Sequence, residues 1–161
     1  SELTAPGVRL VNVRTAADMH QAVLEGFAEA DAVIMSAAVS DYHVANTCSS
    51  KIKKNNKPLI LRLEPNVDIL EELGKSKESQ VLIGFAAEAD DLISNAQKKL
   101  VAKNLDFIIA NDINQRAGGF ASNNNQAVII SNNDIEPLPL MTKRELADII
   151  IDRLSAIISN T

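Results

Sequence analysis

The chain has 161 residues, of which 46% are hydrophobic and 23% charged, and it contains a single cysteine. This length and composition are typical of one globular domain that buries a substantial core. The net charge of −5 argues against a protein that coats nucleic acid, because neutralising phosphates requires an excess of Lys and Arg. Cys48 alone provides neither a disulfide framework nor a cysteine-based metal site, which favours a reducing cytoplasm. No apolar run approaches the roughly 20 residues that span a bilayer.

The start of the chain predicts a strand, a helix and a second strand. Residues 8–13 (VRLVNV) predict a short strand. Thr15 and Asp18 are spaced as a variant of the capping box, which begins an amphipathic helix over 16–30. Residues 32–38 (AVIMSAA) are apolar without alternation, a pattern typical of a parallel strand covered on both faces.

A polar stretch over 40–57 interrupts this alternation, which resumes with a predicted strand over 58–63. Asn66 is a favourable N-cap residue and predicts a helix that ends near Lys75. The apolar residues expected on the inner face of this helix are Val67, Leu70 and Leu73.

The second half continues the alternation and ends in a hairpin and a helix. Thr142 and Glu145 have capping-box spacing at the start of this last helix, which is expected to end at Ser159. The other predicted elements are, in chain order, a buried strand over 81–87, a helix over 90–103, a strand over 105–110, a loop rich in Asn and Gly over 113–126, and a hairpin of 127–131 with 135–140.

Strands that alternate with helices of about 10–15 residues imply βαβ units and a mostly parallel sheet. We therefore expect a single α/β domain over 1–161. Ligands of such sheets bind beyond the carboxyl ends of the strands. That rule directs attention to residues 36–42, 85–88 and 111–112.

The segment 37–42 (AAVSDY) is the first candidate binding element. Small residues at the end of a strand let a ligand approach the backbone closely, and Asp41 adds a carboxylate at the rim of the crevice. The structural alternative is a tight turn that Asp41 caps.

Lysines form two further candidate elements. The segment 51–57 (KIKKNNK) suits a polyphosphate, since charge-assisted hydrogen bonds are worth about 1.5–3 kcal/mol each; the alternative is a solvated loop. Lys99 and Lys103 are four residues apart, so one helical face carries both and could bind one anion; the alternative is an ordinary basic helix C-terminus. The helix start at 66–69 offers backbone N–H groups to a phosphate or a base edge, although a plain N-cap is the commoner case.

Several well-known motifs are absent from the sequence. It contains no GxGxxG or GxxxxGK[ST] phosphate loop, no HExxH zinc motif and no GxSxG nucleophile motif. No base is identifiable near Cys48, so a cysteine nucleophile is not expected.

Six segments taken in order resemble the phosphopantothenoylcysteine synthetases, also called phosphopantothenate–cysteine ligases. These enzymes often form the C-terminal domain of a bifunctional bacterial flavoprotein of coenzyme A biosynthesis. The resemblance extends from about Val11 to Leu154. The segments that carry it are AAVSDY, KIKK, NVDIL, GFAAE, KKLVAKNLD and AND.

The resemblance implies a Rossmann-like three-layer sandwich with a mostly parallel sheet and a C-terminal hairpin plus helix. It further implies a cytoplasmic, homodimeric ligase that condenses 4'-phosphopantothenate with L-cysteine at the expense of CTP, with Mg²⁺. The carboxylate of the pantothenate part would attack the α-phosphate to give an acyl-cytidylate and pyrophosphate, and the cysteine amine would then displace CMP.

The resemblance also assigns roles to individual residues. Lys51 matches the catalytic lysine, and Ala37 and Ala38 match positions against which phosphopantothenate packs. No protein ligand to the metal is implied. The positions that match the nucleotide site are Met35, Ser36, Ala37, Asp41, Asn66, Val67, Asp68, Ile69, Leu70, Phe85, Lys99 and Lys103.

Three alternatives remain open beside this interpretation. One is a relative that uses ATP instead of CTP, the second is a non-catalytic nucleotide-binding module of the same fold, and the third is a polyanion-binding protein. Relatives also begin with a glycine-rich segment that this sequence lacks. We therefore expect the 161-residue chain to be N-terminally incomplete as a ligase.

Overall fold

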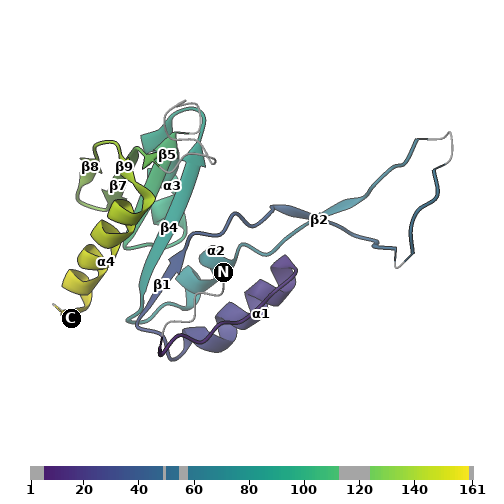
Figure 1. Ribbon diagram of the computed structural model, residues 1–161, viewed down its shortest axis with the longest axis horizontal. Helices are drawn as coiled ribbons and strands as arrows, with labels where there is room; N and C mark the ends of the chain where they lie inside the picture. The colour runs from purple at the N-terminus through teal and green to yellow at the C-terminus, as the bar shows by residue number, and fades with distance from the viewer. Residues whose placement is uncertain (1–5, 49, 55–57, 113–123, 160–161) are drawn as a thin grey trace.

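A five-stranded sheet forms the centre of the computed structural model, which describes residues 6–48, 50–54, 58–112 and 124–159 (Figure 1). Its strand order is β1-β4-β5-β7-β8. The strands are β1 (Ala32–Met35), β4 (Val81–Glu88), β5 (Phe107–Asp112), β7 (Ala127–Ser131) and β8 (Ile135–Pro137). β1, β4 and β5 pair in parallel, whereas β7 and β8 add as an antiparallel hairpin. Only β7 therefore runs against the other strands, which confirms the mostly parallel sheet and the hairpin.

Helices cover both faces of this sheet. On one face, α1 (Ala16–Phe27), α2 (Ile69–Ser76) and α3 (Leu92–Ala102) contribute to one hydrophobic core, and on the other face α4 (Lys143–Ser159) contributes to a second. The predicted three-layer α/β sandwich is confirmed. None of the helices in the described ranges is long and apolar enough to cross a membrane.

The central strands are apolar on both faces because both faces are covered. Leu82 and Ile108 face the core with three helices, while Ile83, Phe107 and Ile109 face α4. All five side chains are at most 1% exposed. This arrangement explains why the sequence of β4 lacks the alternation of a half-exposed strand.

Both predicted capping boxes are present. The Asp18 backbone N–H donates to Thr15 Oγ1, and the Thr15 N–H donates to the Asp18 carboxylate, each at 3.0 Å. At the start of α4, the Glu145 N–H donates to Thr142 Oγ1 at 3.2 Å and the Thr142 N–H donates to Glu145 Oε2 at 2.7 Å. These bonds satisfy N–H groups that a helix start otherwise leaves unpaired. The first helix ends at Phe27, earlier than the predicted residue 30.

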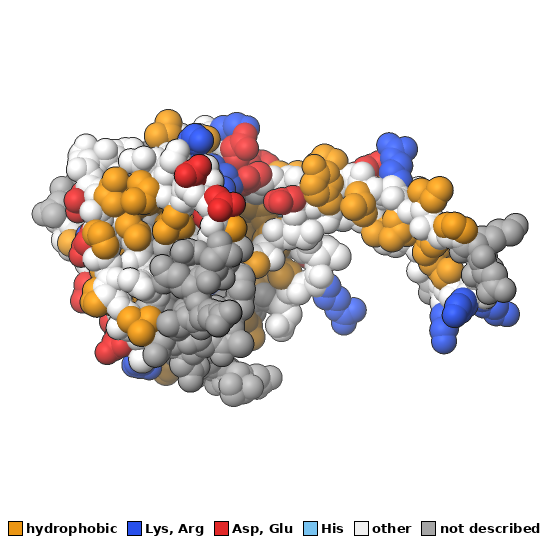
Figure 2. Space-filling view, turned by 90° about the horizontal axis from the view of Figure 1, so that it is seen from above, with side chains coloured by type: hydrophobic (Ala, Val, Ile, Leu, Met, Phe, Trp, Pro, Cys, Tyr) orange, Lys and Arg blue, Asp and Glu red, His pale blue; other side chains and the backbone are white. Residues whose placement is uncertain are grey.

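A narrow arm, comprising the described parts of 42–65, extends away from the sandwich (Figure 1). Its base is a short antiparallel ribbon of β2 (Tyr42–Val44) and β3 (Leu63–Pro65). Hydrophobic side chains follow the arm and Lys side chains lie at its far end (Figure 2). The apolar side chains that the arm exposes by more than half are Tyr42, Ile52, Leu59, Ile60, Leu61 and Leu63.

Two predicted strands differ from the structure because they find no partner strand. The strand expected over 58–63 is wrong except at Leu63, since pairing occurs only where 63–65 faces 42–44. The strand expected over 8–13 is also wrong: Val8 and Leu10 are more than 60% exposed, and no described strand pairs with them.

Two other predicted elements, the strand over 32–38 and the loop over 113–126, also differ from the structure because of contacts with distant parts of the chain. β1 ends at Met35 and lies at the edge of the described sheet, so Ile34 is 37% exposed and the predicted coverage of both faces is wrong. The loop expected over 113–126 contains β6 (Asn124–Asn125), which pairs with β9 (Met141–Thr142); residues 113–123 of that loop, like Lys57, lie outside the described residues.

Candidate functional site

A cavity of about 380 Å³ lies where the base of the arm meets the sandwich. Its walls come from the end of β1, the middle of β4, the segment that leads into the arm, the start of α2 and the end of α3. The lining residues are Met35, Ala37, Val39, Ser40, Asp41, Tyr42, Pro65, Asn66, Val67, Asp68, Ile69, Leu70, Phe85 and Lys103.

Asn66 fixes the rim of the cavity instead of capping a helix, so the predicted N-cap is wrong. Its backbone N–H donates to the Asp41 carbonyl at 2.8 Å, and its side-chain Nδ2 donates to the Ser40 carbonyl at 2.7 Å. Because its amide is used in this way, the next suitable residue, Asp68, becomes the N-cap. Val67 lies before the helix and is 52% exposed, so the inward position expected for it is wrong as well.

Asp68 and Lys103 form an ion pair on the cavity wall. Asp68 Oδ1 accepts the Glu71 N–H at 3.0 Å, which caps α2, and Asp68 Oδ2 accepts from Lys103 Nζ at 2.6 Å. Burial alone would raise the pKa of the Asp68 carboxyl. The hydrogen bonds from Lys103 and the Glu71 amide, together with the lysine charges, outweigh burial and hold that pKa below its ordinary value.

The backbone of Lys103 is fixed by close packing between α2 and α3. A Cβ on Gly74 would lie 2.0 Å from the Lys103 carbonyl oxygen, so only glycine permits this approach. Asn104 follows in the left-handed region, at φ +51°, and its Nδ2 donates to the Gly74 carbonyl at 3.1 Å. The end of α3, and with it Lys103, is therefore placed against α2 by backbone contacts.

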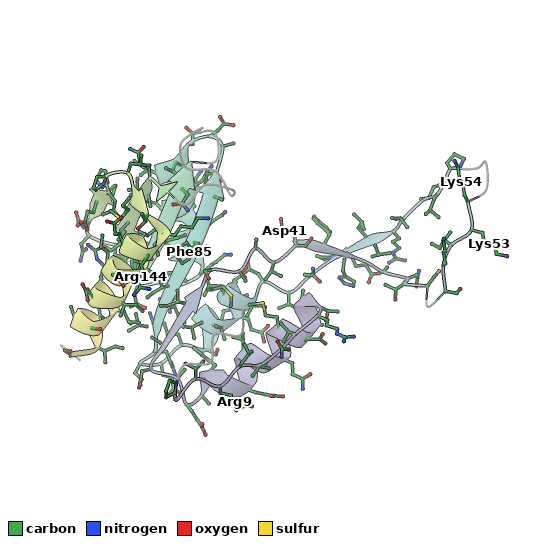
Figure 3. The ribbon with its side chains drawn as sticks, in the orientation of Figure 1. Arg9, Asp41, Lys53, Lys54, Phe85 and Arg144 are labelled. Carbon is green, nitrogen blue, oxygen red and sulfur yellow. The ribbon has the colours of Figure 1, made fainter. Side chains whose placement is uncertain are left out.

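The cavity is also lined by apolar side chains, among them Phe85 on β4, and by the carboxylate residue Asp41 near the base of the arm (Figure 3). Gly84 precedes Phe85 on the opposite face of the strand. A Cβ there would meet Leu70 at 3.0 Å and Leu105 at 2.8 Å. The missing side chain thus allows Leu70 of α2 to reach the sheet and contribute to the lining.

The cavity gathers most of the residues that the sequence predicts for a nucleotide site. Those that line it are Met35, Ala37, Asp41, Asn66, Val67, Asp68, Ile69, Leu70, Phe85 and Lys103. The predicted site residues Ser36, Ala38, Lys51 and Lys99 do not line it. Their predicted roles remain predictions.

The lysines predicted to act together are separated. Lys99 Nζ donates to Glu88 Oε1 at 2.6 Å, whereas Lys103 binds Asp68. Segment 50–54, which contains Lys51, lies toward the far end of the arm, where Lys53 and Lys54 are seen (Figure 3). The expected convergence of these cations on the cavity is therefore not present in the arrangement of this chain.

Sequence reasoning did not assign individual binding roles to four of the lining residues. Val39, Ser40 and Tyr42 fall in the segment that follows β1, whereas Pro65 comes from β3. Tyr42 and Pro65 are register partners in the ribbon. Only the pairing of β2 with β3 brings Pro65 here, and no short-range pattern in the sequence indicates that pairing.

The acidic and basic residues of the cavity do not form a dedicated metal centre. In the described ranges, no group of three or more His, Cys, Asp or Glu side chains could hold a metal ion. Cys48, on the arm, is exposed and outside the cavity.

Fold and cavity together define a Rossmann-like α/β domain with a mixed polar and apolar pocket at the carboxyl end of the parallel strand β1. The chain belongs to the family of the DNA/pantothenate metabolism flavoprotein C-terminal domain, whose model matches residues 1–158.

Individual relatives agree with this membership. The chain is 40% identical, over 94% of its length, to the coenzyme A biosynthesis bifunctional protein CoaBC of Bacillus subtilis strain 168 and also to a cysteine/cysteine sulfinic acid decarboxylase of an unknown prokaryotic organism. It spans only 37% and 43% of those two proteins, respectively. A crystal structure of the C-terminal domain of a CoaBC protein matches 99% of this chain and 71% of that chain, with a TM-score of 0.79 and 33% identity.

Proposed function

We propose that this chain supplies the nucleotide site of a phosphopantothenate–cysteine ligase that acts in the cytoplasm. The observation that carries the proposal is the cavity, in which Asp41, Asn66, Asp68, Phe85 and Lys103 meet although they come from four separate stretches of sequence. Membership of a family that includes CoaBC proteins supports a role in coenzyme A biosynthesis. The decarboxylase name of another relative describes a longer chain, of which this one covers less than half.

The cavity has the chemistry that a nucleoside triphosphate requires. Phe85 and Met35 offer apolar surface to the base and ribose, and Lys103 offers a cation to the phosphates. Mg²⁺ commonly binds through one or two carboxylates together with substrate phosphates. Asp41 fits such a site, and the lack of a three-residue metal cluster among the described residues is compatible with a metal that arrives on the nucleotide.

The reaction has two group transfers. A carboxylate oxygen of 4'-phosphopantothenate attacks the α-phosphorus of CTP, and pyrophosphate leaves with the electrons of the broken P–O bond. The cysteine amine then attacks the acyl carbon of the acyl-cytidylate, loses a proton and expels CMP. Negative charge develops in both transition states. Cations that the protein holds in fixed positions stabilise this charge and thereby lower the two barriers. We assign that role to Lys103 and Lys51, with Lys99 in support.

Lys51 can take part only if the arm brings it to a cavity. We infer that the arm does this in a homodimer, where it would reach the cavity of the partner. The apolar side chains that the arm exposes, led by Ile60 at 91% exposure, support an interface along it. Ala37 and Ala38, proposed to contact phosphopantothenate, lie beside the base of the arm and would then be close to that interface.

Pyrophosphate release from the natural full-length protein tests the proposal, with CTP and ATP compared in the presence of 4'-phosphopantothenate and Mg²⁺. We expect release with CTP and cysteine-dependent formation of the amide. Lys51→Ala should lower kcat by about 10²–10³, the usual effect of removing a group that stabilises a charged transition state. The exposed Lys98→Ala is the matched control and should retain activity. A preference for ATP, or a fully active Lys51→Ala variant, would contradict the assignment.

Mixing two variants tests the dimer. Lys51→Ala and Asp41→Asn should each lose nearly all activity, and a mixed dimer should regain a larger fraction of it because one of its cavities combines both intact residues. Absence of any recovery, with subunit exchange verified, would show that Lys51 and Asp41 serve a site within one chain.

A further inference from the structure

The charge of the cavity lining is unexpected for a site that receives a triphosphate. Among the described lining residues, Lys103 is the single Lys or Arg, whereas Asp41 and Asp68 are both acidic. Moreover, the ammonium of Lys103 is 2.6 Å from Asp68 Oδ2. An anion that enters the cavity therefore meets a lysine that already has a carboxylate partner.

We propose that Asp68 is an internal counter-ion that competes with the anionic ligand for Lys103, so that the ligand must displace a carboxylate in order to bind. This inference rests on the proposed nucleotide site, because it concerns the affinity of that site for phosphates. It gives Asp68 a role distinct from direct contact with the nucleotide.

The exchange is possible because each partner is held in place by a second contact. Asp68 keeps its Oδ1 bond to the Glu71 N–H at the start of α2, where the helix dipole also favours a carboxylate. Lys103 keeps its backbone against Gly74. The ammonium can therefore move from Asp68 Oδ2 to a phosphate oxygen while both helices stay intact.

The strength of the pair suits a displaceable contact. The side chain of Lys103 is 23% exposed and that of Asp68 is 43% exposed, so water screens their attraction and the pair is worth little compared with a buried one. The pair formed by Lys99 and Glu88 is also partly exposed, but it differs because neither residue lines the cavity. Competition is thus expected at Lys103 and not at Lys99.

Every anion that binds Lys103 must first break its ion pair with Asp68, so the free-energy cost is the same for each of them. This cost affects function because it lowers the affinity of the cavity for all anions. A ligand that makes many contacts, such as a nucleoside triphosphate, binds despite the cost. An anion that contacts little besides Lys103, such as inorganic phosphate, is left unbound at concentrations where the triphosphate still occupies the site. Pyrophosphate release after the first transfer would be favoured for the same reason.

The test is the affinity of the natural full-length protein for inorganic tripolyphosphate, measured by isothermal titration calorimetry. Asp68→Asn removes the charge but keeps a good N-cap, and thermal unfolding verifies that the variant folds. We expect binding that is about two- to fivefold tighter than in the wild type, the factor that corresponds to a partly exposed ion pair. Asp152→Asn, exposed on α4 across the sheet, changes the net charge equally and should leave the affinity unchanged.

A double-mutant cycle identifies the route of the effect. If Asp68 acts through Lys103, the gain from Asp68→Asn disappears in a Lys103→Met background. A gain that persists there would mean general repulsion and would overturn the proposal. Unchanged or weaker binding by Asp68→Asn would also overturn it, the latter because Asp68 would then position Lys103 for the ligand. The proposal would also be overturned if neither the wild type nor any of the variants bound tripolyphosphate.

CTP titrations keep the two proposals separate. If the wild type binds tripolyphosphate with the expected pattern but shows no preference for CTP over tripolyphosphate, the nucleotide function fails and the competition stands. If CTP binds with a clear preference and Asp68→Asn has no effect, the competition fails and the nucleotide site stands.

Discussion

The two sides of the cavity differ in how much of their apolar surface is buried. On the sandwich side, Leu73 and Gly74 pack α2 against the sheet and against α3, and both residues are buried. On the arm side, the base is a ribbon with three residues in each strand, and beyond it the arm carries side chains such as Ile60 that are almost fully exposed. One side has its own core, whereas the other has none within the described chain.

This difference in burial gives the two sides different roles in placing functional residues. Packing on the sandwich side fixes the position of Lys103 to within the tolerance of a helix–helix contact. The arm can present residues at a distance but cannot fix them, because a two-stranded ribbon is only marginally stable without other support. We therefore expect substitutions on the sandwich side to affect folding, and substitutions on the arm to affect association.

Leu73→Ala should produce the largest effect, a loss of about 2–5 kcal/mol in the free energy of unfolding, since it leaves a cavity in a fully buried position. Ile60→Ala removes a similar side chain from the arm and should change that free energy by less than about 0.5 kcal/mol. Urea unfolding measures both. In sedimentation experiments the order should reverse, with Ile60→Ala weakening the dimer more. An arm variant as destabilising as the core variant would refute the distinction.

Gly74→Ala probes the contact that positions Lys103. The new Cβ would lie 2.0 Å from a backbone oxygen, and forcing the two helices apart should cost about 1–3 kcal/mol despite the better helix propensity of alanine. Gly26→Ala in α1 is the matched control, because nothing lies within 4 Å of its Cβ position. That variant should gain about 0.5–1 kcal/mol. Equal thermal shifts of the same sign would show that α2 and α3 are not in close contact.

Asn66→Ala should have a smaller effect on stability than Leu73→Ala or Gly74→Ala, about 1 kcal/mol for one lost hydrogen bond, because it removes the bond to the Ser40 carbonyl that joins the two segments flanking the arm. Hydrogen exchange should become faster in β2. Asn95→Ala removes a comparable amide-to-carbonyl bond at the start of α3 and should leave exchange in β2 unchanged. If exchange in β2 is insensitive to Asn66→Ala, the arm is supported by something other than this link.

Elements governed by neighbouring residues could be predicted from the sequence. Thr15 with Asp18 and Thr142 with Glu145 satisfy helix N–H groups within four residues, so both helix starts were predicted correctly. The apolar runs of β4 and β5 likewise reflect burial on both faces. From these runs the layers of the fold followed.

Features that depend on distant partners could not be predicted in the same way. Asn66 and Asp68 are both good N-caps, and only the distant Ser40 carbonyl decides which residue caps α2. For the site, the strand-end rule pointed to lining residues in 37–42 and to Phe85, and the predicted helix start pointed to those in 66–69. Lys99 was predicted to face the same ligand as Lys103, but Glu88, eleven residues earlier, binds it.

The hydrogen bond between the Asn66 amide and the Asp41 carbonyl also bears on how this family can vary. It joins the two ends of the arm at 2.8 Å, so the arm is a loop whose ends are held together where it leaves the sandwich. Lengthening such a loop costs little, because closure entropy grows only with the logarithm of its length. Insertions and deletions between these two residues would leave the sheet untouched, and relatives could thereby change the reach of the arm without redesigning the fold.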